Sequence, residues 1–232
     1  MCISLVYPYY KTPDVVPIHL KIWKKLPPEF EVIIVDDGST VPLPYFDMPN
    51  VRQFRVDVDI PWNYGAKNLG VYHAKNDWIF YSELDHVPDR KFLEGLLELP
   101  RKDCYYMFHR KNNHPDSSPQ YSNRPHPATW FLERKRWWDV GGLDEDFAGF
   151  YGHDDTFFLM CLNHLGVKQV VSDLTLRNLS GNHEVKADLN GVVAKDATRN
   201  GKLLAKKIAE GKWKAENPIR FPWHEVNPKI VI

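Results

Sequence analysis

The sequence is poor in three features that would define its class: cysteine, net charge and long apolar runs. Its 232 residues include only three cysteines, Cys2, Cys104 and Cys161, and their wide spacing fits neither a zinc site nor a disulfide framework. We therefore expect free thiols in a reducing compartment. Lysine plus arginine equals aspartate plus glutamate, 30 of each. Because general nucleic-acid binders carry excess positive charge, we expect no nucleic acid among the partners.

Membrane and export signals are missing as well. No stretch approaches the ~20 apolar residues of a membrane-spanning helix. The opening MCISLVYPYYKTPD has neither the basic region nor the apolar core of a signal peptide. We therefore predict no transmembrane segment and a cytoplasmic location. A hydrophobic content of 43% allows a sizeable core, and the length fits one domain, residues 1–232.

The first half of the chain alternates strand and helix patterns. Apolar runs predict strands at residues 3–7, 31–35 and 78–82, with a weaker one at 51–56. Between them, Val16, Leu20 and Trp23 share one helical face, and Asn63 opens a second helix. This succession predicts an α/β fold with a mostly parallel central sheet flanked by helices.

The second half is less regular. We expect a short helix around residues 92–97, strands at 104–108 and 128–132, and an amphipathic helix near the C-terminus with Leu203, Leu204 and Ile208. A helix after Asp155 should turn Phe158, Cys161, Leu162 and Leu165 inward and end at Gly166. Residues 110–127 hold four prolines and few apolar groups, which indicates a functional loop that closes over a ligand or a disordered one.

Two acidic clusters each follow an apolar strand. Asp36 and Asp37 stand in a turn after the strand at 31–35, and Glu83 and Asp85 follow the strand at 78–82. Since ligands of parallel sheets bind beyond the carboxyl ends of the strands, both clusters should lie at one edge. An Asp-Gly-Ser turn is structural about as often as it binds a ligand. Both interpretations of Asp36 and Asp37 stay open.

Glu83 and Asp85 favour a divalent cation. Residues two apart in an extended segment point the same way, so their carboxylates should come together and repel unless a cation lies between them. Hard oxygen ligands suit Mg²⁺ or Mn²⁺, and Mg²⁺ often shares its coordination with substrate phosphates. The alternative is a solvated polar loop.

A third cluster, His153-Asp154-Asp155, opens a predicted helix. Aspartate is a favoured N-cap and suits the positive end of a helix dipole, which gives a purely structural explanation. The functional explanation is a general base that the same dipole keeps ionised.

Taken together, these clusters resemble glycosyltransferases of family 2 with the GT-A fold. Residues 4–10 (SLVYPYY) resemble the family's opening strand and turn, and residues 35–40 (VDDGST) resemble its Val-Asp-Asp-Gly-Ser nucleotide-binding turn. Residues 63–70 (NYGAKNLG) resemble the Asn-x-Gly and Ala-Arg-Asn-x-Gly stretch before the metal motif. Glu83-Leu84-Asp85 stands where the family places Asp-x-Asp.

Residues 141–147 (GGLDEDF) and 152–157 (GHDDTF) resemble a further element, shared with animal galactosyltransferases and polypeptide N-acetylgalactosaminyltransferases. There the aspartate of a Glu-Asp pair is the catalytic base of inverting members, which implies Asp154 here. Some of those enzymes use a downstream histidine as a metal ligand, and His183 lies at a suitable distance. The resemblance spans residues 3–184.

The resemblance implies the transfer of a sugar from a nucleoside-diphosphate sugar, expected to be a UDP-sugar, to the hydroxyl of a glycan or other acceptor. Residues 1–89 would bind the donor, 90–184 would carry acceptor and catalytic groups, and 185–232 would form a C-terminal helix and tail. Asp85 and His183 would hold Mn²⁺ or Mg²⁺, and Asp154 would be the base. The implied donor-binding residues are Pro8, Tyr10, Asp36, Asp37, Asn63, Gly65, Lys67, Asn68 and Glu83. Trp130, His153 and Asp155 are acceptor-site candidates, with core packing as the alternative for Trp130 and favoured for Trp137 and Trp138.

Three residues depart from the family pattern. Glu83 replaces the first aspartate of the metal motif, His153 replaces a glutamate, and Lys67 replaces an arginine and so loses the bidentate fork. They motivate an alternative, a catalytically impaired module that binds nucleotide-sugar or glycan. A nucleotidyltransferase would need a Gly-rich basic loop that residues 7–10 do not supply. A glycoside hydrolase would use paired carboxylates without nucleotide or metal.

Overall fold

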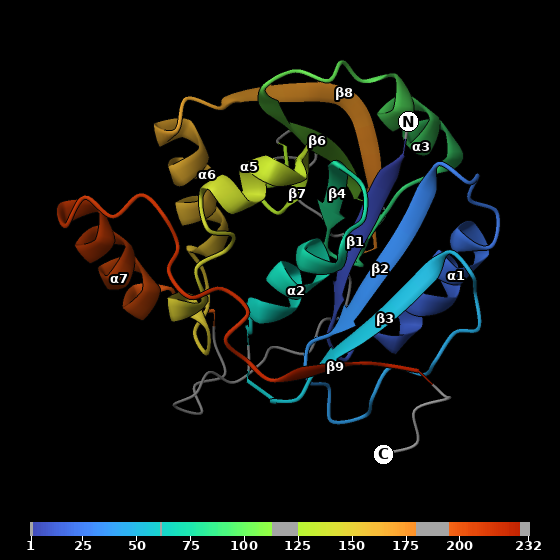
Figure 1. Cartoon of the computed structure of the whole chain (residues 1–232), viewed down its shortest axis with the longest axis horizontal. Coiled ribbons are helices and arrows are strands. Elements are labelled where there is room, and N and C mark those ends of the chain that lie inside the picture. Colours follow the sequence, from blue (N-terminus) through green and yellow to red (C-terminus); the bar gives the residue numbers. More distant parts are fainter. Residues whose placement is uncertain (1, 61, 113–124, 180–194, 228–232) are drawn as a thin grey trace.

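A computed structural model describes residues 2–60, 62–112, 125–179 and 195–227. Its strands form one sheet in the order β5-β8-β6-β7-β4-β1-β2-β3-β9 (Figure 1). The strands are β1 Ile3–Tyr9, β2 Phe30–Asp36, β3 Val51–Val56, β4 Trp78–Ser82, β5 His86–Val87, β6 Cys104–Asn112, β7 Thr129–Glu133, β8 Lys168–Asn178 and β9 Trp223–Glu225. The four strands predicted in the first half are therefore all present.

The sheet is mixed rather than mostly parallel. β1, β2, β3 and β4 pair in parallel, as predicted from the alternation of strands and helices. β7 then lies antiparallel between β4 and β6, and β9 and β5 are antiparallel to β3 and β8. β6 and β8 pair in parallel again. The α/β class is confirmed. The antiparallel pairing of β5, β7 and β9, which all follow β4 in the chain, was not predicted.

Helices cover both faces of the sheet. On one face lie α2 Gly65–His73, α5 Arg134–Asp139 and α6 Asp154–His164, and on the other lie α1 Val16–Trp23 and α3 Arg90–Glu98 (Figure 1). Alternate side chains of β1 serve the two cores: Val6 packs with α2 and α6, whereas Leu5 and Tyr7 pack with α1 and α3. This alternation explains why the strands read as continuous apolar runs.

The helix ends follow local sequence rules. The carboxylate of Asp89 accepts a hydrogen bond of 2.8 Å from the amide of Phe92 and caps α3. Gly166, with φ +86°, stands after α6 in the left-handed region that glycine favours, as predicted. Leu165 was expected to face the core, but it is 47% exposed, because α6 ends at His164 before it.

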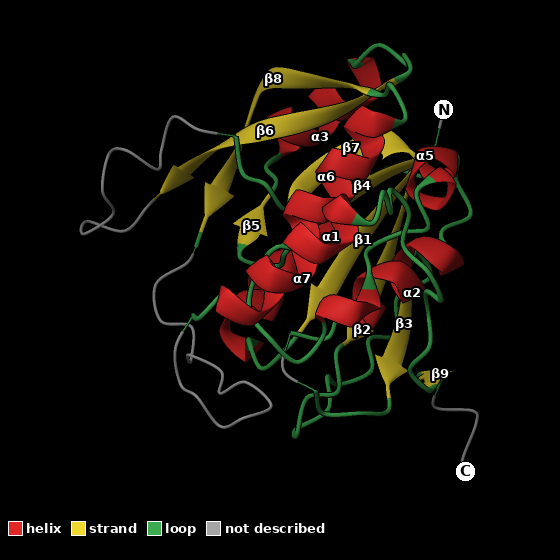
Figure 2. Ribbon diagram, turned by 90° about the vertical axis from the view of Figure 1, so that its left-hand side faces the viewer, coloured by secondary structure: helices red, strands yellow, loops and turns green. Residues whose placement is uncertain are grey.

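The C-terminal part of the described chain wraps around the sheet. After α7 Thr198–Ala209, the segment 211–222 crosses α2 to reach β9 at the outer edge of β3 (Figures 1 and 2). Glu145, the buried first residue of the 3-10 turn η2 Glu145–Phe147, holds this segment in place. Its carboxylate accepts hydrogen bonds from the amides of Ile219 (2.6 Å) and Arg220 (3.0 Å). A second 3-10 turn, η1 Pro13–Val15, precedes α1. Among the described helices, none combines the length and apolarity needed to span a bilayer.

Candidate functional site

The two acidic clusters meet at one edge of the sheet, as predicted. β2 and β4 are the parallel neighbours of β1, with Asp36 beside Tyr9 and Tyr81 beside Val6. The chain therefore leaves β2 at Asp36 and β4 at Ser82 on the same side of the molecule. Asp37, Glu83 and Asp85 follow these strand ends, which is where ligands bind in open α/β sheets.

Asp36 is a structural residue of this edge. One of its carboxylate oxygens accepts the amide of Ser39 at 2.8 Å, and the other accepts the amide of Leu43 at 2.9 Å. The guanidinium of Arg55 adds an ion pair of 2.6 Å to the second oxygen. The Asp36 carboxylate is buried and both of its oxygens already have partners within the protein. Asp36 is therefore poorly placed to bind the donor nucleotide, contrary to the expectation from the sequence. Asp37 is placed beside it by a backbone bond of 2.8 Å from its amide to Tyr9.

Glu83, Asp85 and His86 form a compact cluster. The chain turns after β4, with the amide of His86 donating to the carbonyl of Glu83 at 3.1 Å. As a result, one potential ligand atom from each of the three residues lies within 4.8 Å of the others. The expected pairing of Glu83 with Asp85 is confirmed, but a turn brings it about, not an extended segment. His86 is a further functional candidate. The sequence motif assigned it no role, because the resemblance to Asp-x-Asp ends at Asp85.

A buried histidine behind this turn holds its backbone. The ring of His19, in α1, is fully buried, and its Nε2 lies 2.7 Å from the carbonyl oxygen of Leu84. A carbonyl only accepts hydrogen bonds, so Nε2 carries the proton. Burial lowers the pKa of His19 to about 4, which keeps the ring neutral and this bond intact at neutral pH. His19 thus positions the residue between Glu83 and Asp85.

The donor set of the cluster fits a divalent cation. Two carboxylates and an imidazole are ligands that Mn²⁺ and other first-row ions accept in proteins. The carboxylate of Glu83 is 42% exposed, so a ligand can reach the cluster from solvent, whereas Asp85 is mostly buried. His183, the other expected metal ligand, lies outside the described residues.

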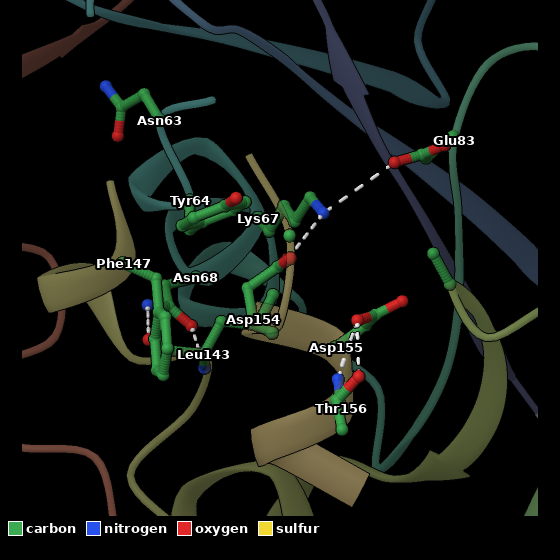
Figure 3. A network of polar contacts seen from close by, with 12 residues as sticks. Asn63, Tyr64, Lys67, Asn68, Glu83, Leu143, Phe147, Asp154, Asp155 and Thr156 are labelled. Atoms are coloured by element: carbon green, nitrogen blue, oxygen red, sulfur yellow. Dashed lines mark hydrogen bonds and ion pairs between the residues drawn. The ribbon is translucent and has the colours of Figure 1, made fainter. Parts of the chain in front are cut away.

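Lys67 connects the metal motif to the candidate base (Figure 3). Its Nζ lies 3.1 Å from Oδ2 of Asp154 and 3.7 Å from Oε1 of Glu83. Burial lowers the pKa of Lys67, but the charges of Asp154, Tyr81 and Glu83 raise it more, so its pKa is well above the usual range. The rings of Tyr64 and Tyr81 lie 5.2 and 5.6 Å from the ammonium. Lys67 is therefore a fixed cation at the centre of the site.

Asp154 begins α6 at this edge. It is buried, and its acidic side chain lies in the first turn of the helix, where the dipole favours negative charge. The preceding His153 adopts φ +69°, a left-handed conformation that turns the chain into the helix. His153 packs against α7, since a Cβ at Gly201 would lie 3.3 Å from its Nε2.

The loop before Asp154 is held by a fully buried asparagine, which sequence reasoning missed. Nδ2 of Asn200, in α7, lies within hydrogen-bonding distance of the carbonyls of Phe147, Phe150, Tyr151 and Gly152, at 2.9 to 3.3 Å. The hydroxyl of Tyr64 adds a bond of 3.0 Å to Phe150. Asn200 therefore fixes the path by which the chain reaches Asp154.

Asp155 is half-buried beside Asp154. Burial, followed by the charge of Asp154, raises its pKa from 3.8 to about 6. Its Oδ1 accepts the amide of Thr156 at 2.6 Å (Figure 3). Asp155 can therefore change charge near neutral pH at the mouth of the site.

Three expected ligand contacts are instead internal contacts. Both ends of the buried Asn68 amide are used. Nδ2 donates to Leu143 and Glu145, and Oδ1 accepts from Trp137 and Leu143. Figure 3 shows Asn68 beside Leu143. A side chain at Gly65 would meet Phe221 at 2.8 Å, so the C-terminal segment covers this glycine. Trp130 is fully buried and stacks on Tyr81 at 5.0 Å, which excludes it as an acceptor platform. Trp137 is likewise in the core, as favoured from sequence.

The remaining expected donor residues lie at strand and helix ends. Pro8 is half-buried near the end of β1. Tyr10 is the first residue after this strand, and its hydroxyl lies 2.8 Å from Oδ1 of Asp59. Asn63 precedes α2 and caps the amide of Gly65 at 2.9 Å through Oδ1. Its Nδ2 is buried and makes no hydrogen bond within the described residues. A buried amide donor of this kind fits a ligand contact.

Comparison with known proteins assigns the family. The sequence matches the model for glycosyl transferase family 2 over residues 4–160, which is more than half of the chain. A comparison with curated proteins gave no significant match. The matched region contains Asp37, Lys67, Glu83, Asp85 and Asp154, so it spans all the groups that meet at the sheet edge.

Solved structures share the fold. The mannosyltransferase PcManGT from Pyrobaculum calidifontis, in complex with GDP-Man and Mn²⁺, has a TM-score of 0.59 and 15% identity, over 78% of this chain and 57% of that one. S. aureus TarS 1–349 in complex with UDP-GlcNAc has a TM-score of 0.61 and 16% identity, over 79% and 60%. The chain thus spans less than two thirds of the length of either protein. It belongs to glycosyl transferase family 2 and has the GT-A fold.

Proposed function

We propose that this chain transfers a sugar from a nucleoside-diphosphate sugar to an acceptor hydroxyl, with a divalent cation and with inversion at the anomeric carbon. The observation that carries the proposal is the Lys67 bridge, which joins the candidate base Asp154 to Glu83 of the metal motif at one strand edge. A transferase of this kind needs the base that faces the acceptor and the cation site that faces the diphosphate to be within reach of one bound donor sugar. The bridge supplies that proximity.

The donor half of the site is assigned to the ends of β1 and β2 and the start of α2. Asp37 would recognise the nucleotide base, because Asp36 is occupied with internal contacts. Pro8, Tyr10 and the buried amide of Asn63 would line the nucleotide pocket, and Lys67 would face the diphosphate. A UDP-sugar is the expected donor. Structures of similar fold were solved with UDP-GlcNAc and with GDP-Man, so both nucleotides enter the test.

Asp85 and Glu83, with His183, would hold Mn²⁺ or Mg²⁺. A bound cation would supply Lewis-acid stabilisation of the charge on the departing diphosphate. Lys67 contributes a second positive charge from the protein itself, at a distance of 3.7 Å from Glu83. Because Lys67 is buried and held between carboxylates, this charge is in place before the donor arrives.

The chemical step is assigned to Asp154. Its carboxylate accepts the proton of the acceptor hydroxyl as that oxygen bonds to the anomeric carbon. The bond from this carbon to the diphosphate oxygen breaks at the same time, and the electron pair leaves with the nucleoside diphosphate. Asp154 lies in the first turn of α6 and 3.1 Å from the ammonium of Lys67, so both the helix dipole and this cation face its carboxylate. His153 and Asp155 would contact the acceptor at the mouth of the site.

Titration with nucleoside diphosphates tests the donor half of this proposal. UDP, GDP, CDP and dTDP are added to the protein with and without Mn²⁺, and binding is followed by calorimetry and by the shift in melting temperature. We expect one of them to bind in a Mn²⁺-dependent manner and to raise the melting temperature. If none binds with or without Mn²⁺, the carboxylates at the strand edge are not a donor site.

A second candidate is a binding module of the same fold that no longer turns over. The replacements Glu83 and His153 at family motif positions favour it. Tight, Mn²⁺-dependent binding of a UDP- or GDP-sugar, without transfer or donor hydrolysis over a broad acceptor panel, would support this candidate over the enzyme. The division into donor, acceptor and C-terminal parts and the cytoplasmic location remain predictions from the sequence.

A further inference from the structure

We propose that His86 is a direct ligand of the cation, and that its imidazole makes the site prefer Mn²⁺ to Mg²⁺. This inference deepens the proposed function, because it concerns the cation of the same site. It goes beyond the carboxylates of the Asp-x-Asp motif, to which the family resemblance points.

The position of His86 is fixed by the sheet. His86 forms β5 with Val87 and pairs with Asn178 of β8, so its backbone is held in a strand. Its side chain is fully buried, and its ring packs against the ring of His126 at 4.3 Å. A ligand held on a strand and by packing is already oriented before the ion binds.

The ring nitrogens of His86 are free to coordinate. Neither nitrogen makes a hydrogen bond within the described part of the chain, although the side chain is fully buried. A buried imidazole without a hydrogen bond is costly, so it calls for a missing partner. Nδ1 lies 2.7 Å from Oδ1 of Asp85, but the two atoms are not aligned for a hydrogen bond. Neighbouring ligands of a six-coordinate ion are separated by about 3 Å, which matches this contact.

The adjacent histidine is not an equivalent candidate. Nδ1 of His126 accepts the amide of Ala128 at 3.2 Å, so that nitrogen is occupied and the proton is on Nε2. Burial and the neighbouring His86 lower the pKa of His126 to about 2, so this ring stays neutral beside the cation site. His126 packs the ligand, and His86 alone of the two shares the cluster with Glu83 and Asp85.

The ligand set then predicts which ion binds. Mg²⁺ prefers oxygen ligands and water, whereas first-row transition ions, Mn²⁺ among them, also accept an imidazole nitrogen. A site with one imidazole and two carboxylates should therefore bind Mn²⁺ more tightly than Mg²⁺. Removing the imidazole should weaken Mn²⁺ binding and leave Mg²⁺ binding nearly unchanged.

The test is pulsed electron paramagnetic resonance of Mn²⁺ bound to the protein, with and without UDP. A nitrogen-14 coupling from a bound imidazole should be present in the wild type and should persist in His183→Gln. It should be absent when His86→Gln or His86→Asn is combined with His183→Gln, because no imidazole ligand then remains. The matched control is His224→Gln. His224 also lies 2.7 Å from an aspartate oxygen, that of Asp57, but it is exposed and outside the cluster.

Competition between Mn²⁺ and Mg²⁺, read from the free Mn²⁺ signal, gives the second measurement. We expect wild-type protein to favour Mn²⁺ by about tenfold or more, and His86→Gln to lose Mn²⁺ affinity by about 10–100-fold, as loss of a partner at a metal site typically costs. The Mg²⁺ affinity should change by less than about threefold, because Mg²⁺ does not depend on nitrogen ligands.

The outcomes separate this inference from the proposed function. Bound Mn²⁺ without a nitrogen-14 coupling in wild-type protein, or a coupling that persists in both double variants of His86 and His183, overturns the role of His86 and leaves the transferase proposal intact. A coupling that depends on His86 in a protein that binds no nucleoside diphosphate supports the metal site and contradicts the transferase. If substitution unfolds both His86 variants, the wild-type and His183→Gln spectra still decide: a coupling in both supports His86, and its loss in His183→Gln overturns it.

Discussion

The ammonium of Lys67 lies 3.1 Å from the carboxylate of Asp154, and both side chains are about nine-tenths buried. The two residues are far apart in sequence, one in α2 and the other at the start of α6. Their pairing ties the helix that borders the donor half of the site to the helix that carries the candidate base. Much of the expected behaviour of this protein follows from this one ion pair.

Loss of Lys67 should destabilise the fold and impair catalysis together. Lys67→Met leaves the carboxylate of Asp154 buried without its partner, which typically costs about 3 kcal/mol or more of unfolding free energy. The double variant Lys67→Met with Asp154→Asn should recover part of this loss, because no unpaired charge remains. Chemical denaturation of the wild type, Lys67→Met, Asp154→Asn and the double variant measures the coupling free energy between the two side chains. Lys135→Met is the control, since its pair with Asp139 is exposed and should contribute less than about 1 kcal/mol. Equal effects of Lys67→Met and Lys135→Met would contradict the pairing.

Asp36 and Asp37 should differ in what their substitution removes. Asp36→Asn breaks the ion pair with Arg55 and should lower the unfolding free energy by about 2 kcal/mol. Asp37→Asn should weaken nucleoside-diphosphate binding by about tenfold or more, the typical cost of losing a charged hydrogen bond. Thermal unfolding and calorimetry of both variants check this. Strong loss of nucleotide binding in folded Asp36→Asn, with none in Asp37→Asn, would reverse the assignment.

Asp155 should make the protein less stable as the pH rises. Its pKa of about 6 in the folded state exceeds its reference value of 3.8, so its contribution to stability is complete below the reference value and is lost as the pH rises through 6. Asp155→Asn, which stays neutral, should therefore raise the melting temperature at about pH 7.5 and have a smaller effect at about pH 5. Melting curves at both pH values measure the difference. A stabilisation that is larger at the lower pH would be the wrong sign.

Asn200 should act on catalysis through the loop that leads to Asp154. Asn200→Ala removes a buried donor from the carbonyls of residues 147, 150, 151 and 152 and should cost about 1–3 kcal/mol of stability. This loop leads directly to Asp154 and touches the start of α2 through Tyr64 and Trp62, so kcat should fall by more than nucleotide affinity. Lys202→Ala, exposed in the same helix, is the control. Parallel losses of kcat and nucleotide affinity would contradict a positioning role.

Strands β1, β2 and β4 were predictable because each is a nearly continuous apolar run between turn residues, whereas β3, with the sequence VRQFRV, has a weaker pattern. The edge at which Asp37, Glu83 and Asp85 meet followed from the parallel order of β4, β1 and β2. The roles of Asn68 and Trp130 were not predictable in the same way. A polar or aromatic residue in a motif can face a ligand or the core, and only tertiary packing decides which. His19 and Asn200 lie far from the motifs in sequence, so their contacts with Leu84 and with the loop before Asp154 required the folded chain.

The most direct test of the account is the transfer rate of Asp154→Asn, measured beside its affinity for the donor. The measurement follows release of nucleoside diphosphate from the donor sugar in the presence of Mn²⁺ and acceptor, with calorimetry on the same protein. We predict that the rate falls by about 10²–10⁴-fold, as expected for loss of a general base. Donor affinity should stay within about threefold of the wild type, because the proposed function places Asp154 against the acceptor and not against the nucleotide. Transfer at the wild-type rate by folded Asp154→Asn would contradict the account.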